Sequence, residues 1–171
     1  YLEPYVVKSV RYLVPALHDL GGMLKGRRLA PVELFEAARK SLRFVGYEGL
    51  SMIAASGLDM AAWDALAKAA NQPLCVLLGG TVGSVKSYNS NGLWLKSPEA
   101  VAAEAIELRD EGGFTGLKLR LGRERITDDL TTLDAVRKAV GDDMHLMIDF
   151  NQGLTLAEAL QRCHVIDDHR L

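Results

Sequence analysis

The fold is decided by two short runs: Gly116-Leu117-Lys118-Leu119-Arg120-Leu121 and Leu146-Met147-Ile148-Asp149-Phe150-Asn151. Polar and apolar side chains alternate in both with a period of two, which is typical of a β-strand. The alternation predicts Lys118 and Arg120 on one face of the first strand, and Asp149 and Asn151 on one face of the second. Burying such groups is costly unless they pair with each other, a metal ion or a substrate. A structural ion pair at a strand end is the alternative interpretation.

A repeating βα pattern surrounds these runs. Strand-like runs at about 85–90, 115–121 and 145–150 alternate with amphipathic helices at about 98–111, 127–140 and 155–168. The strand starts are about 30 residues apart, as in an eightfold βα barrel. A doubly wound sheet has a similar rhythm, but its nucleotide sites usually show a glycine loop after a strand, and no GxxxxGK[ST] occurs here. The pattern favours an α/β fold with three units of a barrel.

Two of the predicted helices have a hydroxyl side chain at the position of an N-cap. Ser97 and Thr155 each precede good helix formers, which predicts a cap at the start of the helix. Thr155 and Glu158 also have the spacing of a capping box.

The first half of the chain has the spacing of helices instead. Apolar residues recur with a helical period over about 4–24, 31–42 and 50–70, and Gly79-Gly80 follows a short apolar turn. We therefore expect two domains, a helical one at 1–80 and a βα one at 81–171. Asp59 and Asp64 lie within the third helix, where a salt bridge or a contact that fixes helix docking is the favoured interpretation.

Composition narrows the class of protein. The formal net charge of the 171 residues is -2, which gives no electrostatic reason to expect nucleic acid or an anionic membrane as a partner. No apolar run approaches the ~18 residues of a membrane span. Cys75 and Cys163 are far apart in helix-like surroundings, so we expect reduced core thiols of a cytoplasmic protein.

Position within a strand separates working residues from structural ones, because catalytic groups of such barrels lie at the carboxyl ends of the strands. On the first predicted strand, Tyr88, Ser90 and Asn91 are candidate hydrogen-bonding groups, although the same residue types are also common in turns. Asp149 suits a hard divalent cation. One carboxylate cannot complete the octahedron that Mg²⁺ prefers, so further ligands must come from elsewhere.

Taken together, the motifs of this chain resemble the enolase superfamily, and within it look most like mandelate racemase. The similarity runs from Tyr1 to Leu171 and is densest in four stretches: Leu29–Val32, Ala55–Leu66, Ala139–Asp143 and Ile148–Gln152. The resemblance implies a partial chain, in which the helical part of an α+β capping domain precedes the first three βα units of a modified (β/α)8 TIM barrel.

The resemblance also implies roles for single residues. Asp149 matches the metal-ligand aspartate of the third strand and Asn151 the asparagine that follows it. Lys118 and Arg120 match a catalytic Lys-x-Lys pair, with the second lysine replaced. Ser90 matches a serine that hydrogen-bonds the substrate carboxylate, and Tyr5 matches a tyrosine of the loop that closes over the substrate.

Chemistry of this superfamily uses Mg²⁺ to stabilise an enediolate while a base removes the α-proton of a carboxylate. The resemblance thus implies Mg²⁺ as cofactor and a small hydroxy acid or acid sugar as substrate. Two-base racemisation needs a base on each face of the α-carbon, and an arginine, which stays protonated near neutrality, is a poor proton acceptor. Arg120 therefore favours one-base dehydration of an acid sugar, with racemisation or epimerisation as the alternative.

A different class of interpretation is a non-catalytic fragment that persists by association. Three of eight barrel strands would leave open edges and uncovered helix faces. Family resemblance also leads us to expect a homo-oligomer.

Overall fold

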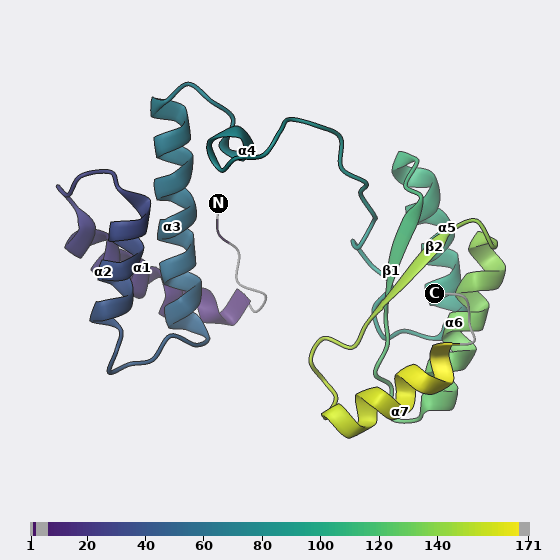
Figure 1. Ribbon diagram of the computed structural model, residues 1–171. Helices are drawn as coiled ribbons and strands as arrows, with labels where there is room; N and C mark the ends of the chain where they lie inside the picture. The colour runs from purple at the N-terminus through teal and green to yellow at the C-terminus, as the bar shows by residue number, and fades with distance from the viewer. Residues whose placement is uncertain (1, 3–6, 168–171) are drawn as a thin grey trace. The chain divides into compact units, whose positions relative to one another are not determined.

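The chain forms two compact units, Tyr1–Ser84 and Val85–Leu171, each considered by itself. Figure 1 shows the computed structural model, which describes Leu2 and residues 7–167. Within those residues, no helix is long and apolar enough to cross a membrane.

The first unit is built from helices alone in its described part. A 3-10 turn, η1 (Val7–Ser9), leads into α1 (Val10–Leu24), and α2 (Pro31–Ser41), α3 (Leu50–Ala69) and the short α4 (Leu74–Leu77) follow. Pro31 stands in the first turn of α2, where its missing N–H removes no helical hydrogen bond. The core of this unit consists of buried residues from α1, α2 and α3: Leu13, Leu20, Ala38 and Ala54.

The second unit alternates helices and strands. In chain order it contains α5 (Pro98–Gly112), β1 (Gly116–Arg120), α6 (Ile126–Val140), β2 (His145–Asp149) and α7 (Leu156–Ile166). The predicted caps are present: the Ser97 hydroxyl accepts from the N–H of Ala100 at the start of α5. Thr155 and Glu158 form the predicted capping box of α7.

Strands β1 and β2 are parallel and hydrogen-bonded, with Lys118 opposite Met147 and Arg120 opposite Asp149. Leu117 and Leu119 are fully buried, and they share one core with apolar residues of α5, α6 and β2. The other face of the strands carries the polar side chains. This packing explains the alternation in the sequence, since the helices cover only the leucine face.

The predicted strand at 85–90 is wrong. Only Asn89 bridges to β1, opposite Leu117, with hydrogen bonds from Asn89 N to Gly116 O (2.9 Å) and from Lys118 N to Asn89 O (3.1 Å). The ladder stops there because the Asn89 side chain accepts from the N–H of Asn91 at 3.0 Å, and because Leu93 has a φ of 55°. The segment keeps the place of a first strand beside β1 without its regular pairing.

The predicted core thiols are also wrong. Cys75 on α4 and Cys163 on α7 are both free and exposed in the structure. Helical periodicity places a residue on a helix, but which side faces the core depends on the neighbouring elements.

Candidate active site at the strand ends

Lys118, Arg120 and Asp149 meet on the polar face of the two strands. The Nζ of Lys118 lies 3.0 Å from Oδ2 of Asp149, and their side chains are 15% and 30% exposed. In the parallel register, Arg120 stands directly opposite Asp149. The sequence alternation predicted these two cations and the carboxylate on one face, and the structure brings them together at the carboxyl ends of the strands. The catalytic and metal-binding roles of these residues stay predictions.

Asp149 is held in its ionised form. Its Oδ1 accepts a hydrogen bond of 2.7 Å from the backbone N–H of Asn151. That hydrogen bond, followed by the one from Lys118 and the charge of Arg120, lowers the pKa of the Asp149 carboxyl below its ordinary value. A carboxylate that stays charged near neutrality and remains partly accessible can serve as one ligand of a divalent cation.

Asn151 does not share the strand face of Asp149 as the alternation predicted. Strand β2 ends at Asp149, and Asn151 and Gln152 take left-handed φ values of 48° and 60°. The chain therefore turns back on itself, and Asn151 contributes its backbone N–H to the Asp149 carboxylate while the residue itself is exposed. Its role in substrate binding stays a prediction.

Arg120 is almost completely buried at 5% exposure. One of its terminal nitrogens, Nη1, donates to the carbonyl of Gly92, and the guanidinium lies 4.1 Å from the centre of the Trp94 ring. Its Nε has no hydrogen-bond partner in the part of the chain that the structure describes. The sequence interpretation missed Gly92 and Trp94, although an aromatic residue just past a predicted strand was an available signal.

The remaining predicted residues lie at different levels along β1. The bridge from Asn89 to Leu117 turns the Asn89 side chain toward α5, where Nδ2 donates to the carbonyl of Leu108 at 3.2 Å. Ser90, the residue after this bridge, is half-buried, and its contact with substrate stays a prediction. Tyr88 lies instead beside Gly116 at the start of β1. A Cβ placed on Gly116 would lie 3.2 Å from the Cβ of Tyr88.

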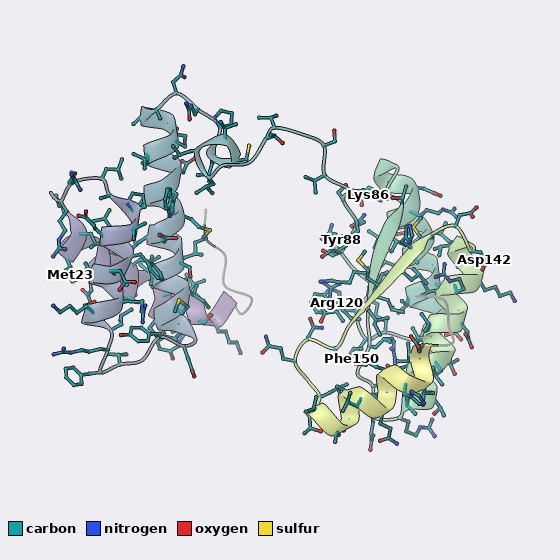
Figure 2. The ribbon with its side chains drawn as sticks, in the orientation of Figure 1. Met23, Lys86, Tyr88, Arg120, Asp142 and Phe150 are labelled. Carbon is teal, nitrogen blue, oxygen red and sulfur yellow. The ribbon has the colours of Figure 1, made fainter. Side chains whose placement is uncertain are left out.

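The structure thus separates Tyr88 from the strand ends where Arg120 lies (Figure 2). Gly116 is four residues before Arg120 on the same strand, and the substrate contact of Tyr88 stays a prediction. Tyr5 falls outside the described residues.

A second charged cluster joins the loop after β1 to α6 and α7. The sequence interpretation missed it. Asp129 on α6 is fully buried and pairs with Arg123 at 3.3 Å and with Arg162 of α7 at 2.8 Å. It also accepts from the backbone N–H groups of Gly122 and Arg123. These contacts tie the loop 121–125 and α7 to α6, so we interpret the cluster as structural.

The described residues do not make a complete metal site. Among them, no group of three or more His, Cys, Asp or Glu side chains lies close enough together to hold a metal ion. Asp149 fits as a single ligand because it is ionised and partly exposed. The other ligands of an octahedral ion would have to come from outside this set.

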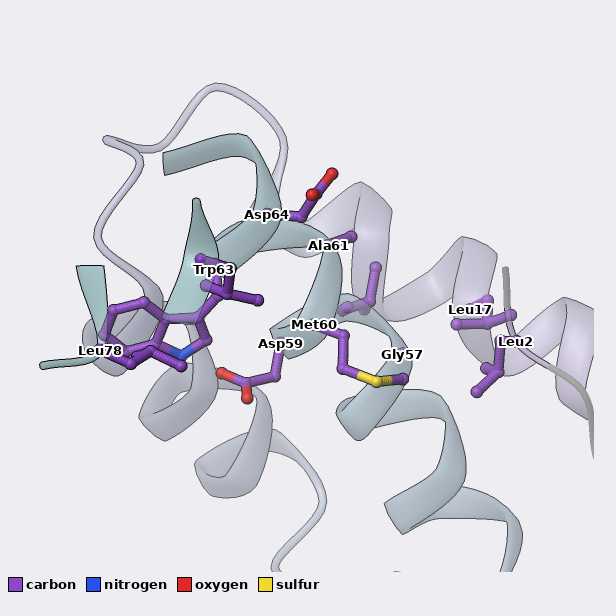
Figure 3. Close-up of a pocket in the computed structure, with 11 residues that line it drawn as sticks. Leu2, Leu17, Gly57, Asp59, Met60, Ala61, Trp63, Asp64 and Leu78 are labelled. Carbon is purple, nitrogen blue, oxygen red and sulfur yellow. The ribbon is translucent and has the colours of Figure 1, made fainter. Parts of the chain in front are cut away.

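A cavity of about 740 Å³ lies in the first unit, and its lining contains none of the strand-end residues. Figure 3 shows it along α3, between Gly57 and Trp63, with Leu17 of α1 and Leu78 at its edges. Its lining is mostly apolar. The salt bridge expected for Asp64 is present, to Lys68 at 2.6 Å, and Asp59 lines the cavity.

Two family descriptions match this chain and divide it between them. Residues 9–79 match "Mandelate racemase / muconate lactonizing enzyme, N-terminal domain", and residues 100–171 match "Enolase C-terminal domain-like". The first match covers the helical unit and the second the βα unit.

Curated relatives include acid-sugar dehydratases, cycloisomerases and epimerases. L-talarate/galactarate dehydratase of Salmonella typhimurium is 40% identical over 108 residues, which are 63% of this chain and 27% of that protein. Arabinonate dehydratase of Saccharolobus solfataricus is 33% identical over 166 residues, 94% of this chain and 39% of that protein. The chain spans less than half the length of these relatives.

Solved structures agree with the sequence relatives. An enolase from alpha proteobacterium bal199, crystallised with bound magnesium, has a TM-score of 0.89 and 65% identity over 99% of this chain and 48% of its own. An enolase from Bradyrhizobium, complexed with magnesium and mandelic acid, has a TM-score of 0.84 and 35% identity, over 98% and 46%.

These matches confirm the predicted fold, which is part of a (β/α)8 barrel preceded by helices of a capping domain. The chain belongs to the enolase superfamily, in the group that includes mandelate racemase-like proteins.

Proposed function

We propose that the full-length protein removes the α-proton of a hydroxycarboxylate in a Mg²⁺-dependent reaction through an enediolate, and that it is an acid-sugar dehydratase. In this proposal residues 1–80 belong to the capping domain and 81–171 supply the first three βα units. The observation that carries it is the cluster of Lys118, Arg120 and ionised Asp149 at the strand ends. The dehydratases among the relatives support the choice of reaction.

Asp149 would hold Mg²⁺ together with ligands from outside the described residues. When bound, Mg²⁺ supplies fixed positive charge against the negative charge that develops on the substrate carboxylate. The ammonium group of Lys118, on the same strand face, would add a second positive charge there. Ser90, which follows the Asn89 that bridges to β1, would hydrogen-bond the carboxylate. Tyr5, Tyr88 and Asn151 would contact other parts of the substrate.

Arg120 would anchor and polarise the substrate. Its guanidinium is bonded to the Gly92 carbonyl and packed on Trp94, and a guanidinium does not accept protons near neutrality. The base in this proposal acts from the opposite face of the α-carbon and belongs to a part of the protein beyond Leu171. One-base elimination follows from that arrangement.

Racemisation or epimerisation is the second candidate. The epimerases among the relatives favour it, including L-Ala-D/L-Glu epimerase of Bacillus subtilis. Two further proposals are a cytoplasmic location, which we base on the unpaired cysteines, and assembly as a homo-oligomer, which we base on the sequence resemblance.

The deciding experiment incubates the full-length protein with Mg²⁺ and a panel of hydroxy acids in D₂O. One-base dehydration predicts loss of water from the substrate and α-hydrogen exchange in one enantiomer only. Exchange in both enantiomers at similar rates would reject the one-base proposal in favour of racemisation. Equal activity in the presence of excess chelator would reject the metal dependence.

A further inference from the structure

We propose that Trp94 is a positioning residue that holds the guanidinium of Arg120 in place at the strand-end site, so that it can bind the carboxylate of the substrate. The effect on substrate rests on the proposed function. The contact between the two side chains rests on geometry alone.

The two side chains have opposite exposures. The Arg120 guanidinium lies 4.1 Å from the ring centre of Trp94, well within the ~6 Å range of a cation–π contact. Arg120 is 5% exposed, whereas Trp94 is 51% exposed. The indole therefore covers a desolvated cation, the setting in which this interaction is strongest.

The residue before Trp94, Leu93, has a strained backbone conformation that is unusual for a leucine. Leu93 is fully buried and has a φ of 55°, and a bulky side chain in the left-handed region is strained and persists only where the surroundings enforce it. Two hydrogen bonds do enforce it. Leu93 N donates to Glu104 Oε2 at 3.0 Å, and Leu93 O accepts from the backbone N–H of Arg120 at 3.1 Å.

Glycine leaves room for a carboxylate in the same turn. A Cβ on Gly92 would lie 2.8 Å from Oε1 of Glu104, the carboxylate that fixes Leu93. The turn therefore presents the Gly92 carbonyl to one end of the guanidinium and the Trp94 ring to its face. A single hydrogen bond would leave the group free to rotate, and the ring removes that freedom.

The guanidinium held in this way retains a donor for a ligand. Its Nε is buried and has no hydrogen-bond partner among the described residues. Arg120 stands opposite Asp149 in the strand register, beside the proposed metal ligand. A carboxylate is the chemical group that best satisfies an unpaired guanidinium donor.

Two substitutions in the full-length protein test the proposal by steady-state kinetics. Trp94→Leu should raise KM for the hydroxycarboxylate about five- to twentyfold while kcat changes less than about twofold, since binding is weakened and the reacting groups are untouched. Trp94→Phe, which keeps an aromatic face, should stay within about threefold of the wild-type KM.

Phe44→Leu is the matched control. Phe44 is 88% exposed and its ring also lies near an arginine, Arg43 at 4.7 Å, but neither residue belongs to the strand-end cluster. This control should leave KM unchanged. A folded Trp94→Leu protein with wild-type KM, or equal KM values for the Leu and Phe variants, would overturn the proposal.

A thermal unfolding cycle separates this inference from the proposed function. If no hydroxycarboxylate is turned over, the proposed function fails, and the unfolding cycle alone then tests whether Trp94 acts through Arg120. Trp94→Leu should lower Tm in the wild-type background and should lower it no further when Arg120→Met is already present. An equal loss of Tm in both backgrounds would show that the ring does not act through Arg120, which overturns the proposal.

Discussion

Two aspartates of the βα unit each face two cationic side chains, yet their surroundings differ. Asp129 is fully buried, pairs with Arg123 and Arg162, and accepts two backbone N–H groups. Asp149 is 30% exposed, pairs with Lys118 and accepts one backbone N–H. A carboxylate whose acceptor positions are all used by the protein stabilises a loop, whereas one that stays accessible can bind a ligand.

Arg162 and Arg120 differ in the same way as the two aspartates. Arg162 donates to Asp129 and to the carbonyl groups of Arg123 and Glu124, so its guanidinium is used for structure. Arg120 donates to one carbonyl and keeps a buried Nε without a partner among the described residues. We therefore interpret the cluster of Asp129 as structural and propose the cluster of Asp149 as the catalytic one, and substitutions can test this difference.

Asp149→Ala in the full-length protein should give the largest effect. We expect kcat/KM to fall about a thousandfold, since metal binding contributes several kcal/mol to the transition state. The free energy of unfolding should change by less than about 1 kcal/mol, because the pair with Lys118 is partly exposed. Assays at several Mg²⁺ concentrations and urea unfolding measure the two quantities. Comparable activity in the variant would remove the metal assignment.

Asp129→Ala should have the opposite profile. Removing one partner of a fully buried ion pair leaves Arg123 and Arg162 uncompensated, so the free energy of unfolding should fall by about 3–5 kcal/mol. Urea unfolding measures it.

Asp128, the neighbour of Asp129, provides the control for the urea unfolding of Asp129→Ala. Asp128 pairs with Arg125 at the surface, so Asp128→Asn should cost less than about 1 kcal/mol. Similar losses for the two variants would contradict the structural assignment of Asp129.

Arg120→Lys tests the base argument. A lysine can accept a proton once its pKa is lowered, so we expect α-hydrogen exchange in the second enantiomer to rise about a hundredfold above that of the wild type. Proton NMR in D₂O follows the exchange of each enantiomer. If exchange stays at the wild-type rate while the variant still binds substrate, the identity of this residue does not limit two-base chemistry.

The smallest expected effect is on the pH dependence of stability. The pKa of Asp149 is lowered in the folded protein, so its ionised form contributes stability above its unfolded pKa of about 3.9. That contribution is lost as the pH falls through the lower, folded pKa. Without metal, the difference in unfolding free energy between wild type and Asp149→Asn should be constant above about pH 5 and shrink below pH ~4. A difference that grows on acidification would contradict this direction.

Local sequence patterns predicted the elements well. The helices α2, α3, α5 and α6 were expected within one or two residues of their observed limits, and the two caps at Ser97 and Thr155 were identified from hydroxyl side chains before good helix formers. Strands β1 and β2 were found because one face of each packs on helices, which imposes a period of two. The same pattern correctly brought Lys118, Arg120 and Asp149 to one face.

Failures occurred where a single side chain or a dihedral angle overrides the pattern. Asn89 captures a backbone N–H that a regular strand would donate to its neighbour, and Asn151 turns back to the carboxylate of Asp149. The buried network of Asp129 joins residues more than 30 positions apart, so no local spacing in the sequence predicts it.

The sequence by itself determined the alternation of helices and strands, the polar strand face and the residue types on it, because these depend on periods of 2 and 3.6 residues. Only the tertiary structure decided which aspartate is enclosed and which is accessible, and that Trp94 covers Arg120. Burial, and the hydrogen bonds left over for a ligand, depend on which distant segments come together, and a one-dimensional pattern does not contain that information.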